Sequence, residues 1–260
     1  MRVLFIGDVV GRPGLEFTEK VLARRLPDWQ PDLVVANGEN ASASGRGLSP
    51  RVAEQLYEAG VELLTLGNHA WDQRELVEYI DTDARIVRPA NFPPGTPGRG
   101  YTVCPVNGKS VLIINVMGRT FLSQLDCPFR AVDEILDGHR DVQHVIVDMH
   151  AETTSEKLAM GWHLDGRVSA VIGTHTHVQT ADERILPRGT AMITDVGMVG
   201  PRNGILGMDR SRILRKMLTQ MPERFAVAEG PCQFCAVLID LHEQTGKAVA
   251  IERVCIYEDS

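Results

Sequence analysis

The sequence contains no apolar run long enough to cross a membrane. Its longest apolar runs, such as Val111–Met117, fall far short of the roughly 20 residues that span a bilayer. The opening MRVLFIGDVV also lacks the long apolar region of a signal peptide, because Asp8 interrupts it early. We therefore expect a buried first strand at the N-terminus and no membrane partner.

Cysteine is scarce, and its number is odd. The five cysteines are Cys104, Cys127, Cys232, Cys235 and Cys255. An odd number in a chain of 260 residues does not predict a disulfide framework, and it fits a reducing, cytoplasmic location. Cys232 and Cys235 form one C-x-x-C in a segment typical of a strand, with no second pair to complete a structural zinc site. We expect a structural role for this pair rather than a metal or redox role.

The sequence has no excess of basic residues. Lys and Arg number 27 against 34 Asp and Glu, which gives a formal charge of −7. This balance argues against charge-driven binding of long nucleic acids or anionic membranes. A small phosphate substrate remains compatible, because bound metals can make one pocket positive. The apolar content of 43% is ordinary for a globular protein, and we predict a single domain over residues 1–260.

Apolar strands and amphipathic helices alternate along the chain. Ser49 and Pro50 predict a helix start that continues to Ala59, because serine is a favoured N-cap and proline a favoured first residue. Asn107-Gly108 and the segment 244–246 predict two β-hairpins. The pattern predicts an α/β layered fold with mixed β-sheets packed between helices, an αββα sandwich. The other expected strands are 3–6, 33–36, 61–66, 142–149, 168–172, 185–186 and 191–194, and the other expected helices are 15–26, 73–80, 155–163 and 209–221.

Polar side chains follow five of the expected strands. They are Asp8 in GD, Glu39 and Asn40 in GEN, Asn68 and His69 in GNH, His150 in DMH, and His175 and His177 in GTHTH. Ligands of α/β sheets bind outside the carboxyl ends of the strands, so we expect these side chains in one cleft. Carboxylate, imidazole and amide donors suit Mn, Fe or Zn. These donor residues are too many for one metal ion. Two metal ions about 3.5–4 Å apart would use them and would suit in-line displacement at phosphorus.

Taken singly, these residues have other interpretations. Asp8 alone is as often a helix cap, and Gly67-Asn68-His69 alone is a plausible turn. His150 alone is more often a buried histidine without a ligand role. Their common position after apolar runs favours the metal site. Four histidines stand outside the set, and of these His163 could approach it; they are His139, His144, His163 and His242.

The order of these motifs resembles that of the calcineurin-type metallophosphoesterases, whose pattern is D-x-H, G-D-x-x-D, G-N-H-[DE], a lone H and G-H-x-H. The segments GDVVGRPG, NGENASASGRGLS, LGNHAWD, DMHAETTSEK, GTHTHVQTAD and TDVGMVGP resemble the YmdB-like subfamily, over about residues 1–255. Departures from the general pattern are Val10 in place of a histidine, Glu39-Asn40 in place of an aspartate, and Ala70 in place of an acid. Asn40 is well placed to replace the missing histidine ligand.

The resemblance implies two metal ions, iron or manganese, and a metal-bridging hydroxide that attacks phosphorus. It implies that Asp8, Asn40 and His177 bind one ion, that Asn68, His150 and His175 bind the other, and that Glu39 bridges them. His69 would donate a proton to the leaving group. Substrate contacts would come from Thr153, Thr154, Ser155 and Arg202. The implied substrates are small phosphodiesters, with 2′,3′-cyclic nucleotides as the expected class.

Other functions stay open at this stage. The same chemistry serves a phosphomonoesterase or a nuclease, although the acidic composition and the lack of basic-aromatic patches disfavour long nucleic acids. A regulator that binds a nucleotide or an RNA-processing partner with little turnover is a second alternative. GDVVGRPG is no phosphate-binding P-loop, because no Gly-Lys-Ser/Thr follows. A homo-oligomer also remains open.

Overall fold

The computed structural model describes residues 1–258. The first of its two sheets contains β1 (Arg2–Ile6), β2 (Asp8–Val9), β3 (Leu33–Asn37), β4 (Leu63–Thr65), β5 (Ile86–Val87), β12 (Met198–Pro201), β13 (Cys232–Leu241) and β14 (Ala248–Tyr257). The strand order is β2-β12-β13-β1-β3-β4-β5, and β14 pairs with β13. Strands β1, β3, β4 and β5 run parallel, whereas β13 is antiparallel to β1.

The second sheet contains β6 (Tyr101–Val106), β7 (Lys109–Met117), β8 (His144–His150), β9 (Ala170–Thr174), β10 (Arg184–Ile185) and β11 (Ala191–Ile193). Its order is β10-β11-β9-β8-β7-β6. The four central strands are parallel to one another, and β6 and β10 are antiparallel edges. Both sheets are therefore mixed, as the sequence predicts.

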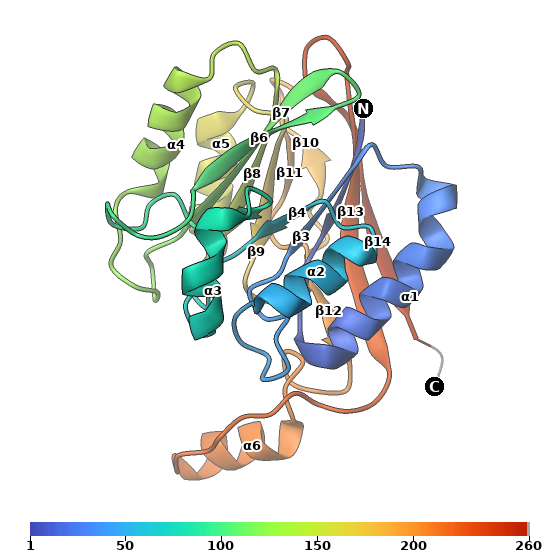
Figure 1. The fold of residues 1–260 in the computed structure, drawn as a ribbon, viewed down its shortest axis with the longest axis vertical. Coiled ribbons are helices and arrows are strands. Elements are labelled where there is room, and N and C mark those ends of the chain that lie inside the picture. The colour runs from blue at the N-terminus through green and yellow to red at the C-terminus, as the bar shows by residue number, and fades with distance from the viewer. Residues whose placement is uncertain (259–260) are drawn as a thin grey trace.

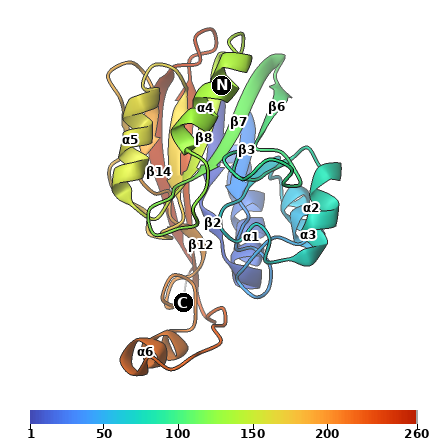
Figure 2. The same ribbon diagram turned by 90° about the vertical axis from the view of Figure 1, so that its left-hand side faces the viewer.

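Helices cover the outer face of each sheet (Figures 1 and 2). The described residues form the helices α1 (Gly11–Trp29), α2 (Pro50–Glu58), α3 (Arg74–Tyr79), α4 (Pro128–Gly138), α5 (Thr154–Leu164) and α6 (Arg210–Thr219), with a short 3-10 helix η1 (Ile80–Thr82). Helices α1, α2 and α3 pack on the first sheet, and α4 and α5 pack on the second. The predicted αββα sandwich is confirmed. The prediction of one domain over residues 1–260 stays a prediction, and its residues 259–260 lie outside the described residues.

Side-chain alternation builds three apolar layers from these strands. In β3, Val34 and Ala36 pack beneath the helices, whereas Leu33 and Val35 face the second sheet. This follows from the two-residue period of a strand. Strands such as β3 and β8 are buried along their whole length, which explains why they are continuous apolar runs in the sequence. The same parallel strands bring their carboxyl ends to one edge, where the polar loops lie.

Local signals predict several elements closely. Ser49 caps α2, because its side chain accepts a hydrogen bond from the backbone N–H of Val52. Asn107 and Gly108 both have positive φ, of 48° and 75°, as a tight hairpin turn requires. Helix α1 begins at Gly11, earlier than the predicted residue 15, with Pro13 in its first turn, where a missing N–H costs little. The sequence patterns did not predict α4, β2, β5 and β12.

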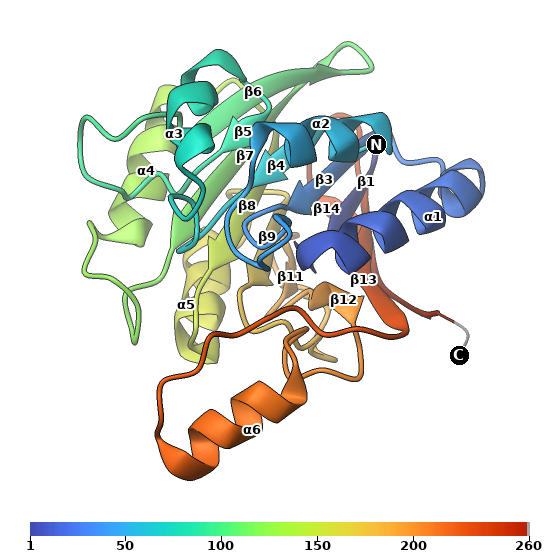
Figure 3. The same cartoon turned by 60° about the horizontal axis from the view of Figure 1, so that its bottom comes forward.

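Residues 202–231, here called the arm, connect β12 to β13 and carry α6. Figures 1 to 3 show that α6 extends away from the two-sheet body. Asp209 caps it by accepting hydrogen bonds from the N–H groups of Ser211 and Arg212. Its residue Leu218 is 82% exposed. None of the helices in residues 1–258 has the length and apolar character needed to cross a bilayer.

Candidate metal centre

The first group of donors surrounds the ring of His150, the last residue of β8. Its Nε2 lies 3.0 Å from Glu39 Oε1, from Asn68 Oδ1 and from His175 Nδ1. One ring nitrogen carries at most one proton, so a hydrogen bond can satisfy one of these three contacts but not all. Donor atoms of Glu39, His150 and His175 lie within 4.8 Å of one another. A cation among them would satisfy the whole group.

The second group consists of Asp8, Asn40 and His177. His177 Nε2 lies 3.2 Å from Asn40 Oδ1 and 3.9 Å from Asp8 Oδ1. The Asp8 side chain is fully buried, and its Oδ1 has no hydrogen-bond partner within residues 1–258. A buried carboxylate oxygen without a partner is costly, and a second cation would supply the missing interaction. The two groups are joined because Asp8 Oδ2 accepts a hydrogen bond of 3.2 Å from the backbone N–H of His175.

The loop after β9 holds two histidines in a strained backbone conformation. His175 and His177 have φ values of 102° and 65°, in the left-handed region that non-glycine residues avoid. Thr176 between them is fixed by Asp195, whose Oδ2 accepts from the Thr176 backbone N–H at 3.0 Å and from its hydroxyl at 2.7 Å. Lys157 donates to the same oxygen at 2.7 Å, so a buried ion pair anchors this loop.

In each histidine of the two groups, the ring nitrogen that faces away from the other donors contacts a further protein atom. His175 Nε2 lies 3.0 Å from Glu152 Oε2, and His177 Nδ1 lies 3.1 Å from the Leu206 carbonyl oxygen. His150 Nδ1 lies 2.9 Å from Thr174 Oγ1, and that hydroxyl donates to Asp148. Such outer contacts fix the ring and leave one nitrogen facing inward, as in metal-binding histidines.

Glu39 is held at the centre by backbone groups. The Asn37 side-chain oxygen accepts from its N–H at 3.1 Å, and Glu39 Oε2 accepts from the His69 N–H at 2.9 Å. Gly67 allows this approach, since any Cβ there would clash with His150 and Glu39. This geometry fits the expected bridging role of Glu39, which stays a prediction.

Burial and mutual contact shift the acidities of these groups in the protein without ions. Burial raises the pKa of Asp8 to about 6. Burial also raises the pKa of Glu39, but the nearby His150 outweighs it and brings the pKa to about 2. For His150, burial lowers the pKa, and Glu39 more than compensates and raises it to about 9. Burial together with His150 lowers the pKa of His175 to about 3. Glu39 thus stabilises a positive charge on His150, whereas a second positive charge on His175 is disfavoured.

His69 lies beside the ligand groups without belonging to either. Its Nδ1 is 3.0 Å from Asp72 Oδ2, and its side chain is 22% exposed. It lines a pocket of about 240 Å³ together with members of both donor groups, Glu39 and His175 of the first and Asn40 and His177 of the second. The residues around this pocket are Glu39, Asn40, Gly45, Arg46, His69, Glu152, His175, Thr176, His177, Leu206, Met208 and Phe225. This position fits the expected proton donor.

The predicted substrate contacts are not among the described residues that line this pocket. They are Thr153, Thr154, Ser155 and Arg202. The Thr153 hydroxyl donates to Glu156, and Arg202 stacks over the Tyr257 ring at 4.4 Å. Their assignment as substrate contacts stays a prediction that this geometry does not support.

Other candidates are also set apart by the fold. His163 does not approach the centre, because its ring contacts Asp133 at 3.0 Å. The thiols of the C-x-x-C pair point to different partners: Cys232 Sγ lies 3.7 Å from the Pro13 carbonyl oxygen, and Cys235 Sγ lies 4.0 Å from Cys255 Sγ. This arrangement fits the structural role expected for the pair.

Sequence reasoning missed several polar residues of the site. Glu152, Asp72 and Arg46 are charged residues close to predicted donors, and each lies in a motif that the resemblance already identified. Their proximity in the chain to His150, His69 and Asn40 was the available signal. What the sequence does not show is which of these side chains turns toward the pocket.

The profile of the YmdB-like protein family matches residues 4–254. The chain belongs to this family. The resemblance found from the motifs is therefore confirmed over nearly the whole length.

A relative from Bacillus subtilis (strain 168), a 2′,3′-cyclic-nucleotide 2′-phosphodiesterase, is 52% identical over 260 residues, which are 100% of this chain and 98% of the relative. Two crystal structures share the fold. A novel phosphatase from Mycoplasma pneumoniae superposes with a TM-score of 0.95 at 36% identity, covering 100% of this chain and 94% of that one. A hypothetical protein from Thermus thermophilus superposes with a TM-score of 0.94 at 46% identity, and 100% of each chain is covered.

Proposed function

We propose that this protein is a phosphodiesterase that hydrolyses small phosphodiesters, with 2′,3′-cyclic nucleotides as substrates and two bound metal ions as cofactors. The observation that carries the proposal is the meeting of two donor groups, around His150 and around His177, at one pocket of about 240 Å³. A pocket of this size suits a small ester better than a nucleic acid duplex. The activity of the Bacillus subtilis relative supports the substrate class.

The charge balance of the pocket favours an anionic substrate. Two divalent ions would bring four positive charges, and Asp8 and Glu39 would bring two negative ones. Glu152 and Arg46 at the pocket wall offset each other. About two positive charges would therefore face a phosphate at contact distance and outweigh the acidity of the chain as a whole.

Bound ions would polarise the phosphoryl oxygens and lower the pKa of a coordinated water, which is the chemistry that metal pairs supply in phosphoester hydrolysis. The chain itself holds the donors in place and positions a proton source. His69 is that source, since Asp72 orients its ring through Nδ1 and leaves Nε2 for the substrate. A ribose alkoxide is a poor leaving group, so a proton delivered to it by His69 assists departure.

Iron or manganese is the proposed metal, as the motif resemblance implies. Imidazole, carboxylate and amide groups, with no thiolate among them, suit these ions. A cytoplasmic location stays a prediction. A homo-oligomeric state also remains open.

The test is metal analysis of the purified protein followed by hydrolysis of a substrate panel. The panel contains 2′,3′-cyclic nucleotides, linear diesters and phosphomonoesters. We expect about two ions per chain and the fastest turnover on the cyclic nucleotides, with 3′-monophosphates as products, because cleavage at the 2′ oxygen leaves the phosphate on the 3′ oxygen. Glu39→Gln should lose most of its metal and its turnover. Preferential hydrolysis of monoesters, or full activity in Glu39→Gln, would refute the proposal.

A further inference from the structure

The pocket at the metal centre has two chemically different walls. One wall carries the polar donors, among them Asn40 and His177. The other wall comes from the arm and consists of Leu206, Met208 and Phe225. None of these three side chains carries a charge or a hydrogen-bonding group. The arm therefore brings an apolar surface to a site for an anionic group.

The arm is fixed to the metal centre at its base. The Leu206 carbonyl oxygen lies 3.1 Å from His177 Nδ1, and Leu206 has a strained φ of 52°. Met208 forms β-bridges to Ile205 and Val227, which close the arm on itself. At Gly45, in the loop after Asn40, an added Cβ would lie 2.9 Å from Val227 and 3.2 Å from Met208. The apolar wall thus keeps a defined position relative to the donors.

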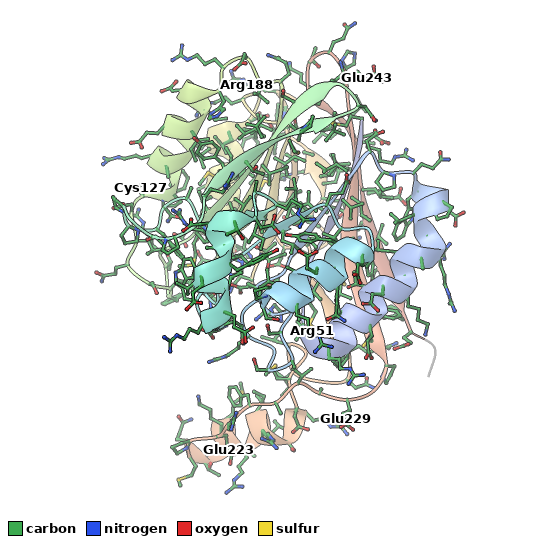
Figure 4. All side chains as sticks on the ribbon, in the orientation of Figure 1. Arg51, Cys127, Arg188, Glu223, Glu229 and Glu243 are labelled. Atoms are coloured by element: carbon green, nitrogen blue, oxygen red, sulfur yellow. The ribbon has the colours of Figure 1, made fainter. Side chains whose placement is uncertain are left out.

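The apolar side chains of this wall stay accessible. Leu206 is 46% exposed, and Phe225 is partly buried. Lys216 Nζ lies 5.0 Å from the centre of the Phe225 ring, a cation–π contact that helps to hold the ring. Figure 4 labels Glu223 and Glu229, which bracket the segment that returns from α6 to the body and contains Phe225. Exposed apolar side chains that gather at one pocket are typical of ligand-binding surfaces.

We propose that Leu206, Met208 and Phe225 form a nucleobase subsite, in which the base of the substrate stacks on Phe225 while its phosphate lies at the donor groups. This inference rests on the proposed function and adds the group that recognises the nucleoside. Stacking on an aromatic ring is available to every base, because each base has a π face. With no polar side chain on this wall, the subsite favours purines by their larger stacking area and does not read the base edge.

The test separates the base from the phosphate ester. Wild type and Phe225→Ala are assayed on 2′,3′-cyclic AMP and on a base-free analogue, the 2′,3′-cyclic phosphate of methyl ribofuranoside. We expect the KM of Phe225→Ala for 2′,3′-cyclic AMP to rise about 10-fold, as the loss of one base–aromatic stack predicts. Its kcat, and both constants for the base-free analogue, should stay close to wild type. Phe225→Trp should keep the low KM, since an aromatic ring remains.

A matched control is Phe121→Ala, which removes an 87% exposed phenylalanine that does not line the pocket. Equal losses on both substrates in Phe225→Ala, or an unchanged KM for 2′,3′-cyclic AMP, would overturn the subsite. Calorimetric binding of 3′-AMP and of ribose 3-phosphate to the metal-loaded protein distinguishes the two proposals. Tighter binding of 3′-AMP that Phe225→Ala abolishes upholds the subsite even if no diester is hydrolysed, whereas equal binding of both ligands refutes it.

Discussion

At the scale of single residues, His69 is the side chain whose role can be separated from metal binding. It lies in the pocket beside both donor groups, and its ring contacts Asp72 rather than a donor. We expect His69→Ala to keep its metal content and lose about 10²–10⁴-fold in kcat, the usual contribution of a positioned general acid. Metal analysis and steady-state kinetics on 2′,3′-cyclic AMP measure both quantities.

Asp72→Asn is the companion variant. It keeps the shape of the side chain that orients His69 and removes its charge, so we expect a smaller loss of kcat with metals retained. A wild-type rate in His69→Ala would exclude His69 from proton transfer, and loss of metal in that variant would make it a ligand instead.

His144 is a residue for which we predict an effect on stability rather than on activity. It begins β8, its side chain is buried, and its Nε2 has no hydrogen-bond partner within residues 1–258. Burial lowers its pKa, and the positive N-terminus and Lys109 act in the same direction. The unfolded chain therefore binds a proton at this residue more readily than the folded protein does, so the free energy of unfolding falls as pH drops through the ordinary histidine pKa of about 6.5.

We expect His144→Gln to weaken that pH dependence, because glutamine does not titrate. Urea unfolding of both proteins between about pH 8 and about pH 5 measures it. The variant should lose less unfolding free energy over this interval than wild type. Parallel curves would show that His144 does not contribute to acid sensitivity.

At the scale of elements, helix α5 is tied to the segment after β11 by the buried pair of Lys157 and Asp195. Asp195 also fixes Thr176 and, through it, the two strained histidines. Removal of one partner leaves the other charge buried and alone, which costs about 3–5 kcal/mol. We expect Lys157→Met to lower the free energy of unfolding by about this amount, as measured in urea.

Lys20→Met is the matched control for this change. Lys20 also pairs with a carboxylate, that of Glu258, at the same distance of 2.7 Å, but its side chain is 45% exposed. Exposed pairs contribute about 0–1 kcal/mol, so this variant should stay near wild type. Equal effects of the two substitutions would mean that the buried pair does not anchor the loop.

Sequence signals predicted the elements whose cause is local. Helix α2 has its cap at Ser49, and the β6–β7 hairpin has its turn at Asn107-Gly108. Helix α4 has Pro128 at its first position, but its N-cap residue Cys127 provides no side-chain cap, so its local start signal is weaker than that of α2. The strands β2 and β12 have two and four residues; β2 exists because it pairs with β12, and β12 because it also pairs with β13. No periodicity can develop over so few residues.

The same distinction, between features with a local cause and features that depend on distant parts of the chain, applies to the candidate site. The structure brings the predicted donors together in two adjacent groups, because each donor follows an apolar run and parallel strands bring such ends to one edge. The surrounding contacts could not be found in this way. The pairing of Thr176 with Asp195 depends on side-chain directions that residue spacing does not specify. The apolar wall also depends on where the arm folds back, and no pattern within its own residues encodes that.

At the scale of the whole molecule, the candidate metal centre joins the two sheets. Asp8, Glu39 and Asn68 belong to or follow strands of the first sheet, whereas His150 and His175 come from the second. Ions bound between them would therefore link the two halves of the sandwich. They would stabilise the folded state and not the unfolded chain, in which these residues are far apart. By mass action, a metal at about 100 times its dissociation constant adds about 2.7 kcal/mol, which raises the Tm of a chain of this size by several degrees.

We expect chelator treatment to lower the Tm by that amount and Mn²⁺ to restore it. Asn40→Ala should respond less than wild type, because it keeps the donors around His150 and loses one from the group of His177. Its metal content should fall from about two ions per chain toward one. Full occupancy and a full Tm response in Asn40→Ala would show that Asn40 is no ligand. A Tm that is independent of metal in the wild type would show that the ions, where they bind, do not hold the two sheets together.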